Sequence, residues 1–266
     1  MMNILPNKLL LSSYQIISQT AMFATLPLLL SAALAAALPT APVSSPRSLG
    51  PRAETWDTWC GAVQQYPGGK VQSVEASWVV PNISVPAGGN SQNDYWVYHW
   101  VGIDGSYGCQ TGILQAGTSV DITQGYIRTQ FWWEFWPDWP VFINDIELAP
   151  GHEVYVKVTA SGTRSGTIYL ENKTTGNQRS IPVNMNDPNG ALCFSTAAFV
   201  AEDPHSSTQW WPLANFAGTT MANCGGTTWD GKTFGLNNAN VGNMVQYGQT
   251  RCTAQLTSGN SVYIQG

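Results

Sequence analysis

The run Glu153–Gly162, EVYVKVTASG, decides the fold class of this chain, because its apolar side chains recur at every second residue. Val154, Val156 and Val158 fall on one face of an extended backbone, and more polar residues alternate with them on the other face. A repeat of two residues is the pattern of a half-buried β-strand, whereas an amphipathic helix repeats every 3.6 residues. The run therefore predicts a strand with one face in a core.

Similar segments recur along the chain, and turns rich in Gly, Pro, Asn and Asp separate them. Helical periodicity is hard to find, and no internal repeat is apparent. Many strands with short connections predict an all-β fold, an antiparallel sandwich or jelly roll. We expect strands around 71–80, 95–103, 112–122, 126–136, 153–161, 166–172, 193–202 and 243–256.

The first 53 residues differ in composition from the rest. Residues 22–38 form an uncharged apolar run that ends in small residues, and this pattern predicts a secretory signal peptide over residues 1–38. A run of this length could also span a bilayer as a retained anchor. Residues 39–53, which carry four Pro and two Arg, are expected to be a short pro-segment or linker. Residues 54–266 then form one domain, because nothing in them resembles a linker.

Composition excludes several classes of protein. The 266 residues include 11 Lys or Arg and 16 Asp or Glu, which gives a net charge of −5. Without a basic excess, the chain lacks the electrostatic pattern of a nucleic-acid-binding protein. Because 43% of the residues are hydrophobic and 12 are Trp, the chain is also not a disordered one. We expect a secreted, extracellular monomer that has no contact with a membrane after the signal peptide is removed.

The cysteines and sequons agree with export. Five Cys, at 60, 109, 193, 224 and 252, lie in the predicted domain without zinc-ligand spacing, so at least one disulfide and one free thiol are expected. Sequons at Asn82 and Asn172 predict N-glycosylation.

Elimination narrows the possible chemistry. The chain has no GxSxG, no Asp-Thr-Gly or Asp-Ser-Gly, no HExxH and no glycine loop for phosphate. Its three His residues are widely spaced, so no metal and no cofactor are expected. Any chemistry must therefore depend on carboxylates, amides and aromatic side chains.

Two segments place polar side chains where a ligand could reach them. In Gly112–Gly117, alternation puts Gln115 on the same face as Gly117, where the backbone is approachable; the alternative is a Gln at a solvated edge. In Phe131–Trp139, Trp132 and Glu134 share one face and Phe131 shares the other with further aromatics. Aromatic side chains on both faces indicate that one face lines a groove, or that both are covered and Glu134 is a paired core residue.

A third segment, Cys193–Pro204, is a mostly small apolar strand that ends in the acid pair Glu202-Asp203. Partial burial would raise the pKa of Glu202, and hydrogen bonds to its carboxylate would lower it. Terminal acids on strands are common, so this segment alone does not separate a functional acid from a solvated one.

Together the segments resemble the eqolisins, the glutamic peptidases of fungi. The resemblance runs from about Trp59 to the C-terminus, and three sequence motifs carry it: WVGIDG at 100–105, ILQAG at 113–117, and an aromatic-Glu-aromatic-aromatic-Pro-Asp pattern at 133–138. It implies a jelly-roll or concanavalin-like sandwich of two curved antiparallel sheets, with a cleft across one of them. Two departures stand out: Pro204 follows the acid pair, and the pro-segment is short for the family.

The resemblance also implies roles for particular residues. Gln115 and Glu202 match the family's catalytic dyad, and Cys109 and Cys193 match a disulfide near it; Cys60, Cys224 and Cys252 have no assigned partner. The supporting or substrate-binding residues of the family match Trp100, Asp104, Asp121, Trp132 and Glu134.

In such a site, ionised Glu202 would remove a proton from the attacking water, and the Gln115 amide would stabilise the oxyanion of a protein or peptide substrate. An unperturbed glutamate would give this secreted endopeptidase an acidic pH optimum. The alternative is a secreted glycoside hydrolase that uses Glu134 and Glu202 as its paired carboxylates, or a carbohydrate-binding sandwich without catalysis.

Overall fold

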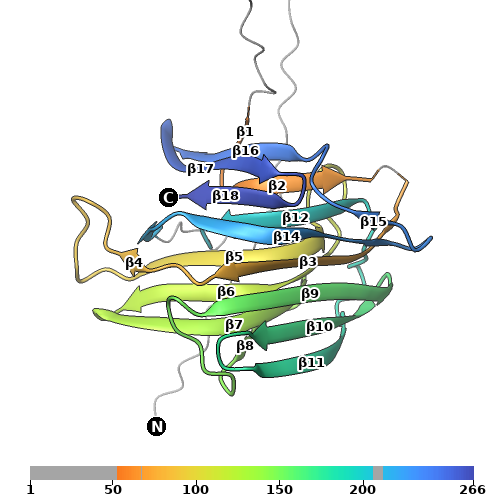
Figure 1. Ribbon diagram of the computed structural model, residues 1–266, viewed down its shortest axis with the longest axis horizontal. Helices are drawn as coiled ribbons and strands as arrows, with labels where there is room; N and C mark the ends of the chain where they lie inside the picture. Colours follow the sequence, from red (N-terminus) through yellow and green to blue (C-terminus); the bar gives the residue numbers. More distant parts are fainter. Residues whose placement is uncertain (1–52, 67, 206–211) are drawn as a thin grey trace, which may run out of the picture. The chain divides into compact units, whose positions relative to one another are not determined.

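In the computed structural model, which describes residues 53–266 except residue 67 and residues 206–211, the chain is built from strands, and no helix occurs in that part. The strands form an antiparallel sandwich without a closed barrel (Figure 1). The all-β sandwich expected from the sequence is confirmed. The predicted signal peptide and nearly all of the predicted pro-segment lie outside the described residues. Within the described residues, no helix is long and apolar enough to cross a membrane.

The first sheet carries most of the segments singled out in the sequence. Its strands follow the order β8-β7-β6-β5-β12-β2-β16, and β1 joins as a parallel partner of β16. Their bounds are β1 Glu54–Trp56, β2 Trp59–Gln65, β5 Tyr95–Asp104, β6 Ile113–Thr123, β7 Tyr126–Trp136, β8 Val141–Ile143, β12 Thr196–Glu202 and β16 Asn240–Gln246.

The second sheet covers the inner face of the first. Its order is β11-β10-β9-β3-β14, and β18 and β17 continue the hydrogen bonding from β14 to β16 of the first sheet. In Figure 1, β3 and β9 lie in front of β5 and β6, with which they make contact. The bounds are β3 Val71–Val79, β9 Glu153–Gly162, β10 Ser165–Asn172, β11 Asn177–Asn184, β14 Thr219–Thr228, β15 Thr233–Phe234, β17 Gln249–Ser258 and β18 Ser261–Gln265; a separate small pair joins β4 Ile83–Ser84 to β13 Asn215–Phe216.

The core lies between the two sheets and follows the alternation seen in the sequence. Val154, Val156 and Val158 of β9 are fully buried, as the run at 153–162 predicts. From the opposite sheet, Phe131 and Phe135 of β7 enter the same core. The outer face of this sheet has a smaller cluster of its own, which includes Tyr98, Trp100 and Trp132. The aromatic run of β7 therefore serves a core on one side and a second, site-lining layer on the other.

Two expected strands differ from the observed ones. The segment expected at 193–202 becomes a strand only from Thr196, because the backbone N–H groups of residues 193–196 donate to the Asp104 carboxylate instead of to a neighbouring strand. The segment expected at 243–256 is two strands, β16 and β17, separated by a turn at Tyr247-Gly248, where both residues have positive φ. The sequence did not predict strands β1, β2, β4, β8, β11, β13, β14, β15 and β18.

Two disulfides connect the described residues. Cys109 bonds to Cys193, the pair that the resemblance implies, and Cys60 bonds to Cys252, a pair that the sequence did not assign. Cys224 is the buried free thiol. The Cys109–Cys193 bond joins the loop before β6 to the loop before β12, so it ties together the two segments that lead to Gln115 and Glu202.

Candidate active site

A hollow opens on the outer face of the first sheet, where β5, β6, β7 and β12 run side by side. Register explains why distant residues meet there: Gln115 lies opposite both Gly102 and Glu134, and Glu202 lies opposite Tyr98. The side chains that line the hollow are Tyr98, Gln115, Trp132, Glu134, Pro140, Glu202, Pro204 and His205. The two residues expected to form a dyad therefore share one pocket.

Gln115 is fully buried and its amide is oriented by Glu134. Its Nε2 donates to Oε2 of Glu134 at 2.5 Å, and its Oε1 has no hydrogen-bond partner within the described residues. Gly102 makes room for this arrangement, because a Cβ there would lie 2.9 Å from the Trp100 ring and 3.1 Å from Cβ of Gln115. The amide thus keeps one N–H and its carbonyl oxygen for a ligand.

Glu202 is held by indole groups. Trp100 on β5 donates its Nε1–H to Oε2 of Glu202 at 2.6 Å, and Trp59, directly opposite Glu202 on β2, is a second donor. The two indoles pack edge to face with ring centroids 4.9 Å apart. Oε1 of Glu202 has no partner in the described part of the chain. One carboxyl oxygen is therefore fixed, and the other is available for chemistry.

Among the described residues that line this hollow, no Lys or Arg accompanies the two glutamates. Burial, and to a lesser extent the nearby charge of Glu202, raises the pKa of Glu134 to about 8, against the lowering effect of the hydrogen bond from Gln115. Burial also raises the pKa of Glu202 to about 7, against the lowering effect of Trp100 and Trp59. The indole donors favour the ionised form of Glu202, and the neighbouring charge of Glu202 favours the protonated form of Glu134, so the environments of the two carboxyls suit different roles.

Asp104 lies away from the hollow and has a positioning role. This buried residue has a φ of 71° and accepts hydrogen bonds from four consecutive backbone N–H groups, those of residues 193–196. It thus fixes the start of β12, the strand that ends at Glu202. Asp121 is also outside the hollow, six residues beyond Gln115 on the same face of β6, where it pairs with Arg128.

The sequence did not indicate Trp59, nor the hydrogen bond from Gln246 to the acid pair Glu202-Asp203. Asp203 is buried beside Glu202, accepts from Nε2 of Gln246 at 2.7 Å, and has its pKa raised by burial to about 7. A signal for Trp59 existed in the sequence, because Trp59 begins the strand WCGAVQQ. The glycine and the glutamines of this segment obscure its alternation of apolar and polar residues. Gln246 is the last residue of β16, whose sequence NVGNMVQ shows no regular alternation, so nothing local points to it.

The two predicted glycosylation sites differ. Asn82 is exposed, so a glycan there stays a prediction. Asn172 is fully buried, and its Nδ2 donates to the Glu147 carbonyl at 2.7 Å while its Oδ1 accepts from the backbone N–H groups of Thr174 and Thr175. Because this amide has no space for a sugar, its burial argues against a glycan at Asn172 in the folded chain.

Comparisons with known proteins agree with this geometry. A model of the Peptidase A4 family matches residues 57–266. The chain is 30% identical to Aspergillopepsin-2 of Aspergillus niger over 220 residues, 77% of this chain and 76% of the relative. It is also 30% identical to Scytalidopepsin B of Scytalidium lignicola over 214 residues, 77% of each chain.

Solved structures show the same relation. Scytalido-glutamic peptidase bound to a transition state analog inhibitor has a TM-score of 0.68 and 29% identity, covering 79% of this chain and 98% of the other. Aspergilloglutamic peptidase from Aspergillus niger has a TM-score of 0.60 and 32% identity, covering 64% and 98%. From its sequence and its fold together, the chain is a member of the Peptidase A4 family, the eqolisins, and a glutamic endopeptidase.

Proposed function

We propose that this peptidase is a secreted acid endopeptidase that hydrolyses protein substrates with Gln115 and Glu202 as its catalytic dyad. The observation that carries the proposal is the pair of free polar atoms in one hollow, Oε1 of Gln115 and Oε1 of Glu202, beside an amide that retains one N–H. Relatives with about 30% identity bind a transition state analog inhibitor and the tripeptide Ala-Ile-His. An extended peptide is therefore the ligand expected here.

The chemistry follows from these free atoms. Ionised Glu202 takes a proton through Oε1 from a water that the Gln115 carbonyl oxygen helps to hold. As this water attacks the scissile carbonyl carbon, the remaining Nε2–H of Gln115 donates to the developing oxyanion. Glu202 then passes the proton to the leaving amine, and the peptide bond breaks. Glu134, whose raised pKa favours the protonated form, keeps the Gln115 amide oriented.

The pH range of the reaction has two limits. The sequence-based argument for an acid optimum assumed an unperturbed Glu202, and this premise is wrong, because burial raises the pKa of Glu202 to about 7. Base action therefore increases as the pH rises towards 7. However, the buried carboxyls Glu134, Glu202 and Asp203 favour the folded state only while they hold their protons, so folding weakens over the same range. The two limits together place the working range on the acid side of neutral.

Secretion is proposed from the sequence alone. The apolar run at 22–38 followed by a Pro-rich segment is typical of a signal peptide and a short pro-segment, so the mature enzyme would begin near residue 54. The two disulfides suit an oxidising compartment. N-terminal sequencing of the secreted protein tests both boundaries.

Digestion of casein between pH 2 and 7 tests the peptidase mechanism. The Glu202→Gln variant keeps the size of the side chain but cannot accept a proton, so we expect digestion to fall at least 10³-fold. Glu147→Gln, on an exposed side chain far from the hollow in the fold, is the matched control and should retain full activity. Proteolysis that survives in Glu202→Gln would overturn the proposed base, and release of reducing sugar from xylan would support the glycosidase alternative.

A further inference from the structure

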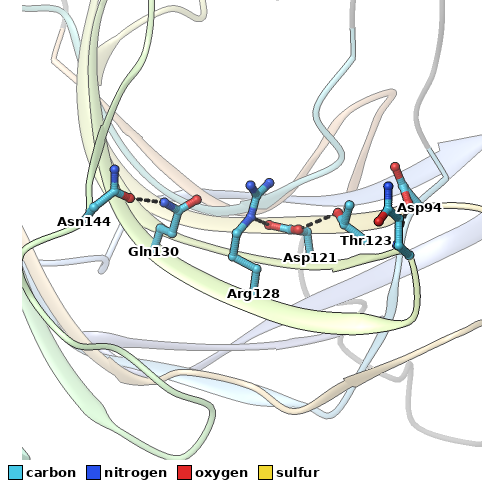
Figure 2. Close-up of polar contacts among 7 residues, drawn as sticks. Asp94, Asp121, Thr123, Arg128, Gln130 and Asn144 are labelled. Atoms are coloured by element: carbon cyan, nitrogen blue, oxygen red, sulfur yellow. Dashed lines mark hydrogen bonds and ion pairs between the residues drawn. The ribbon is translucent and has the colours of Figure 1, made fainter.

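A row of polar side chains continues the face of the hollow along the β6–β7 hairpin. Asp121 and Thr123 of β6, Arg128 and Gln130 of β7, and Asn144 after β8 form this outer row, in which hydrogen bonds connect Asn144 to Gln130 and Asp121 to both Arg128 and Thr123 (Figure 2). Asp121 lies six residues from Gln115, as Arg128 does from Glu134, so all four side chains project from the same face. At about 3.4 Å per residue, the outer row is ~20 Å from the dyad.

In the Asp121–Arg128 ion pair, only Nε of the guanidinium contacts the carboxylate. Nε of Arg128 lies 3.2 Å from Oδ1 of Asp121, and Oγ1 of Thr123 donates to Oδ2 at 2.8 Å, so both carboxylate oxygens are occupied. The Asp121 side chain is 3% exposed, whereas that of Arg128 is 58% exposed. The terminal nitrogens of Arg128 point away from Asp121 in Figure 2 and make no hydrogen bond to a described residue. Asp121 thus binds the Nε side of the guanidinium and leaves the edge with the two terminal nitrogens open to a ligand.

Arg128 is also the sole Lys or Arg on the strands of this face, since β5, β6, β8 and β12 carry none and β7 carries only this one. Guanidinium groups bind carboxylates with two parallel N–H···O bonds, a geometry that the two terminal nitrogens can supply. An acidic side chain of a peptide is therefore the group that this edge can recognise.

Unpartnered polar atoms lie between the dyad and the outer row. Oγ of Ser119 and Nε1 of Trp132 are buried without a hydrogen-bond partner among the described residues. Ser119 lies between Gln115 and Asp121 on β6, and Trp132 lies between Glu134 and Arg128 on β7. A peptide backbone that follows this face would supply the missing partners, because its carbonyl and N–H groups recur along its length.

We propose that the outer row is a substrate subsite in which Arg128, held in place by Asp121, selects a glutamate or aspartate side chain several residues away from the scissile bond. This inference rests on the proposed endopeptidase function and adds a specificity to it. A substrate carboxyl ionises at a pKa near 4, so the preference should be present at pH 5.5 and disappear at pH 3.

A set of matched peptides tests the subsite. The peptides share one cleavable segment and carry either Glu or Gln at a single position, which is moved from three to seven residues on each side of the cleaved bond. For the wild-type chain at pH 5.5 and low salt, we expect kcat/KM to be about five-fold higher for Glu than for Gln at one or two neighbouring positions, mainly through KM. The ratio should fall to 1 at pH 3 and decline in 0.5 M salt.

Variants then assign the preference to Arg128. In Arg128→Gln, the Glu-to-Gln ratio should fall to about 1, and in Arg128→Glu it should fall below 1, because the introduced carboxylate repels the Glu of the peptide. Arg179→Gln is the matched control, because Arg179 also pairs with an aspartate but lies on β11 of the other sheet; it should keep the wild-type ratio.

The possible failures are distinguishable. If the wild-type chain cleaves none of the peptides, the proposed function is wrong. If it cleaves them with a ratio of 1 at every position, the subsite is wrong and the peptidase stands. A ratio that persists in Arg128→Gln also overturns the inference, and because the pH and salt dependence are measured on the wild-type chain, the test does not depend on the variants folding.

Discussion

The inner hollow and the outer row of the same sheet face surround their carboxyl groups with different hydrogen-bond partners. In the inner hollow, Glu134 and Glu202 are buried against neutral donors, an amide and two indoles, and burial raises the pKa of both. In the outer row, Asp121 is equally buried but faces the guanidinium of Arg128. The carboxyls of the inner hollow accept hydrogen bonds from neutral groups, whereas the carboxylate of the outer row fixes the position of a cation. The same strands, β6 and β7, therefore carry Gln115 and Glu134 of the inner hollow at one end and the Asp121–Arg128 ion pair at the other.

Apart from the change of Glu202 described above, the largest expected effect comes from removing the neutral donor of the inner hollow. Gln115→Ala should lower kcat by about 10²–10³, since a single oxyanion donor contributes that much. Gln115→Glu should be as inactive, because it adds a third carboxyl to a hollow that holds two. Steady-state kinetics on a chromogenic peptide measures the effect, with Gln178→Ala on the exposed part of β11 as control. Retention of more than a tenth of the activity in Gln115→Ala would contradict the dyad.

A smaller effect is expected from changing an indole that donates to Glu202. Trp100→Phe removes the 2.6 Å hydrogen bond to Oε2, which favours the ionised form. The pKa of Glu202 should rise further, so the acid limb of the pH–kcat/KM profile should move to higher pH and activity at pH 5 should fall about 10-fold. Trp229→Phe, at an exposed indole, should leave the limb in place. An unmoved limb in Trp100→Phe would mean that another group sets the acid side of the profile.

The stability of the fold should depend on pH in an unusual direction. Between the ordinary Glu pKa of 4.5 and about 8, the folded chain binds more protons than the unfolded chain, because burial raises the pKa of Glu134. By linkage, the free energy of unfolding is highest near the lower end of this window and falls as the pH rises through it. Urea unfolding at pH 5, 6, 7 and 8 measures the slope.

Glu134→Gln, which cannot bind the extra proton, should have a shallower slope than the wild-type chain, and Glu147→Gln should match the wild type. Equal slopes in all three proteins would contradict a raised pKa at Glu134. His99 limits stability from the acid side: it is fully buried against Phe216, and burial lowers its pKa to about 3, so the folded state loses stability as the pH falls from 6.5 towards 3.

The smallest effect is expected in the outer row. Asp121→Asn removes the charge behind Arg128, which leaves the guanidinium less well placed but still present. We expect a two- to three-fold loss of kcat/KM on a peptide with Glu at the preferred position, and a stability change below about 1 kcal/mol for this half-exposed pair. Asp145→Asn, the partner of Arg179, is the control. A loss as large as that of Gln115→Ala would mean that Asp121 belongs to the catalytic centre and that the two ends are not distinct.

Part of the fold was predictable from the sequence, because the alternation that marks a strand involves residues that are close together in the chain. Alternation identified the strands that correspond to β3, β5, β6, β7, β9 and β10, and it placed Gln115 with Gly117 and Trp132 with Glu134. Strand β14, TTMANCGGTT, was not predicted because its glycines and polar residues follow no regular period. It forms through its pairing with β3.

The candidate site was predictable in its members but not in its electrostatics. The order of motifs identified Gln115 and Glu202, yet Trp59 and Gln246 reach the acid pair only through strand pairing and side-chain packing across the sheet. The assumption of an ordinary glutamate also failed, because a pKa depends on the burial and charges around a group in three dimensions.

By itself, then, the amino-acid sequence determined the all-β class, which side chains share a face, and the family to which the polar residues belong. Tertiary structure alone decided that β12 and β6 flank β5, that Glu202 therefore meets Gln115 in one hollow, and that the Asn172 side chain is buried. The reason is that alternation is set by residues a few positions apart, whereas sheet order, burial and the resulting proton affinities arise from contacts between segments that are far apart in the chain.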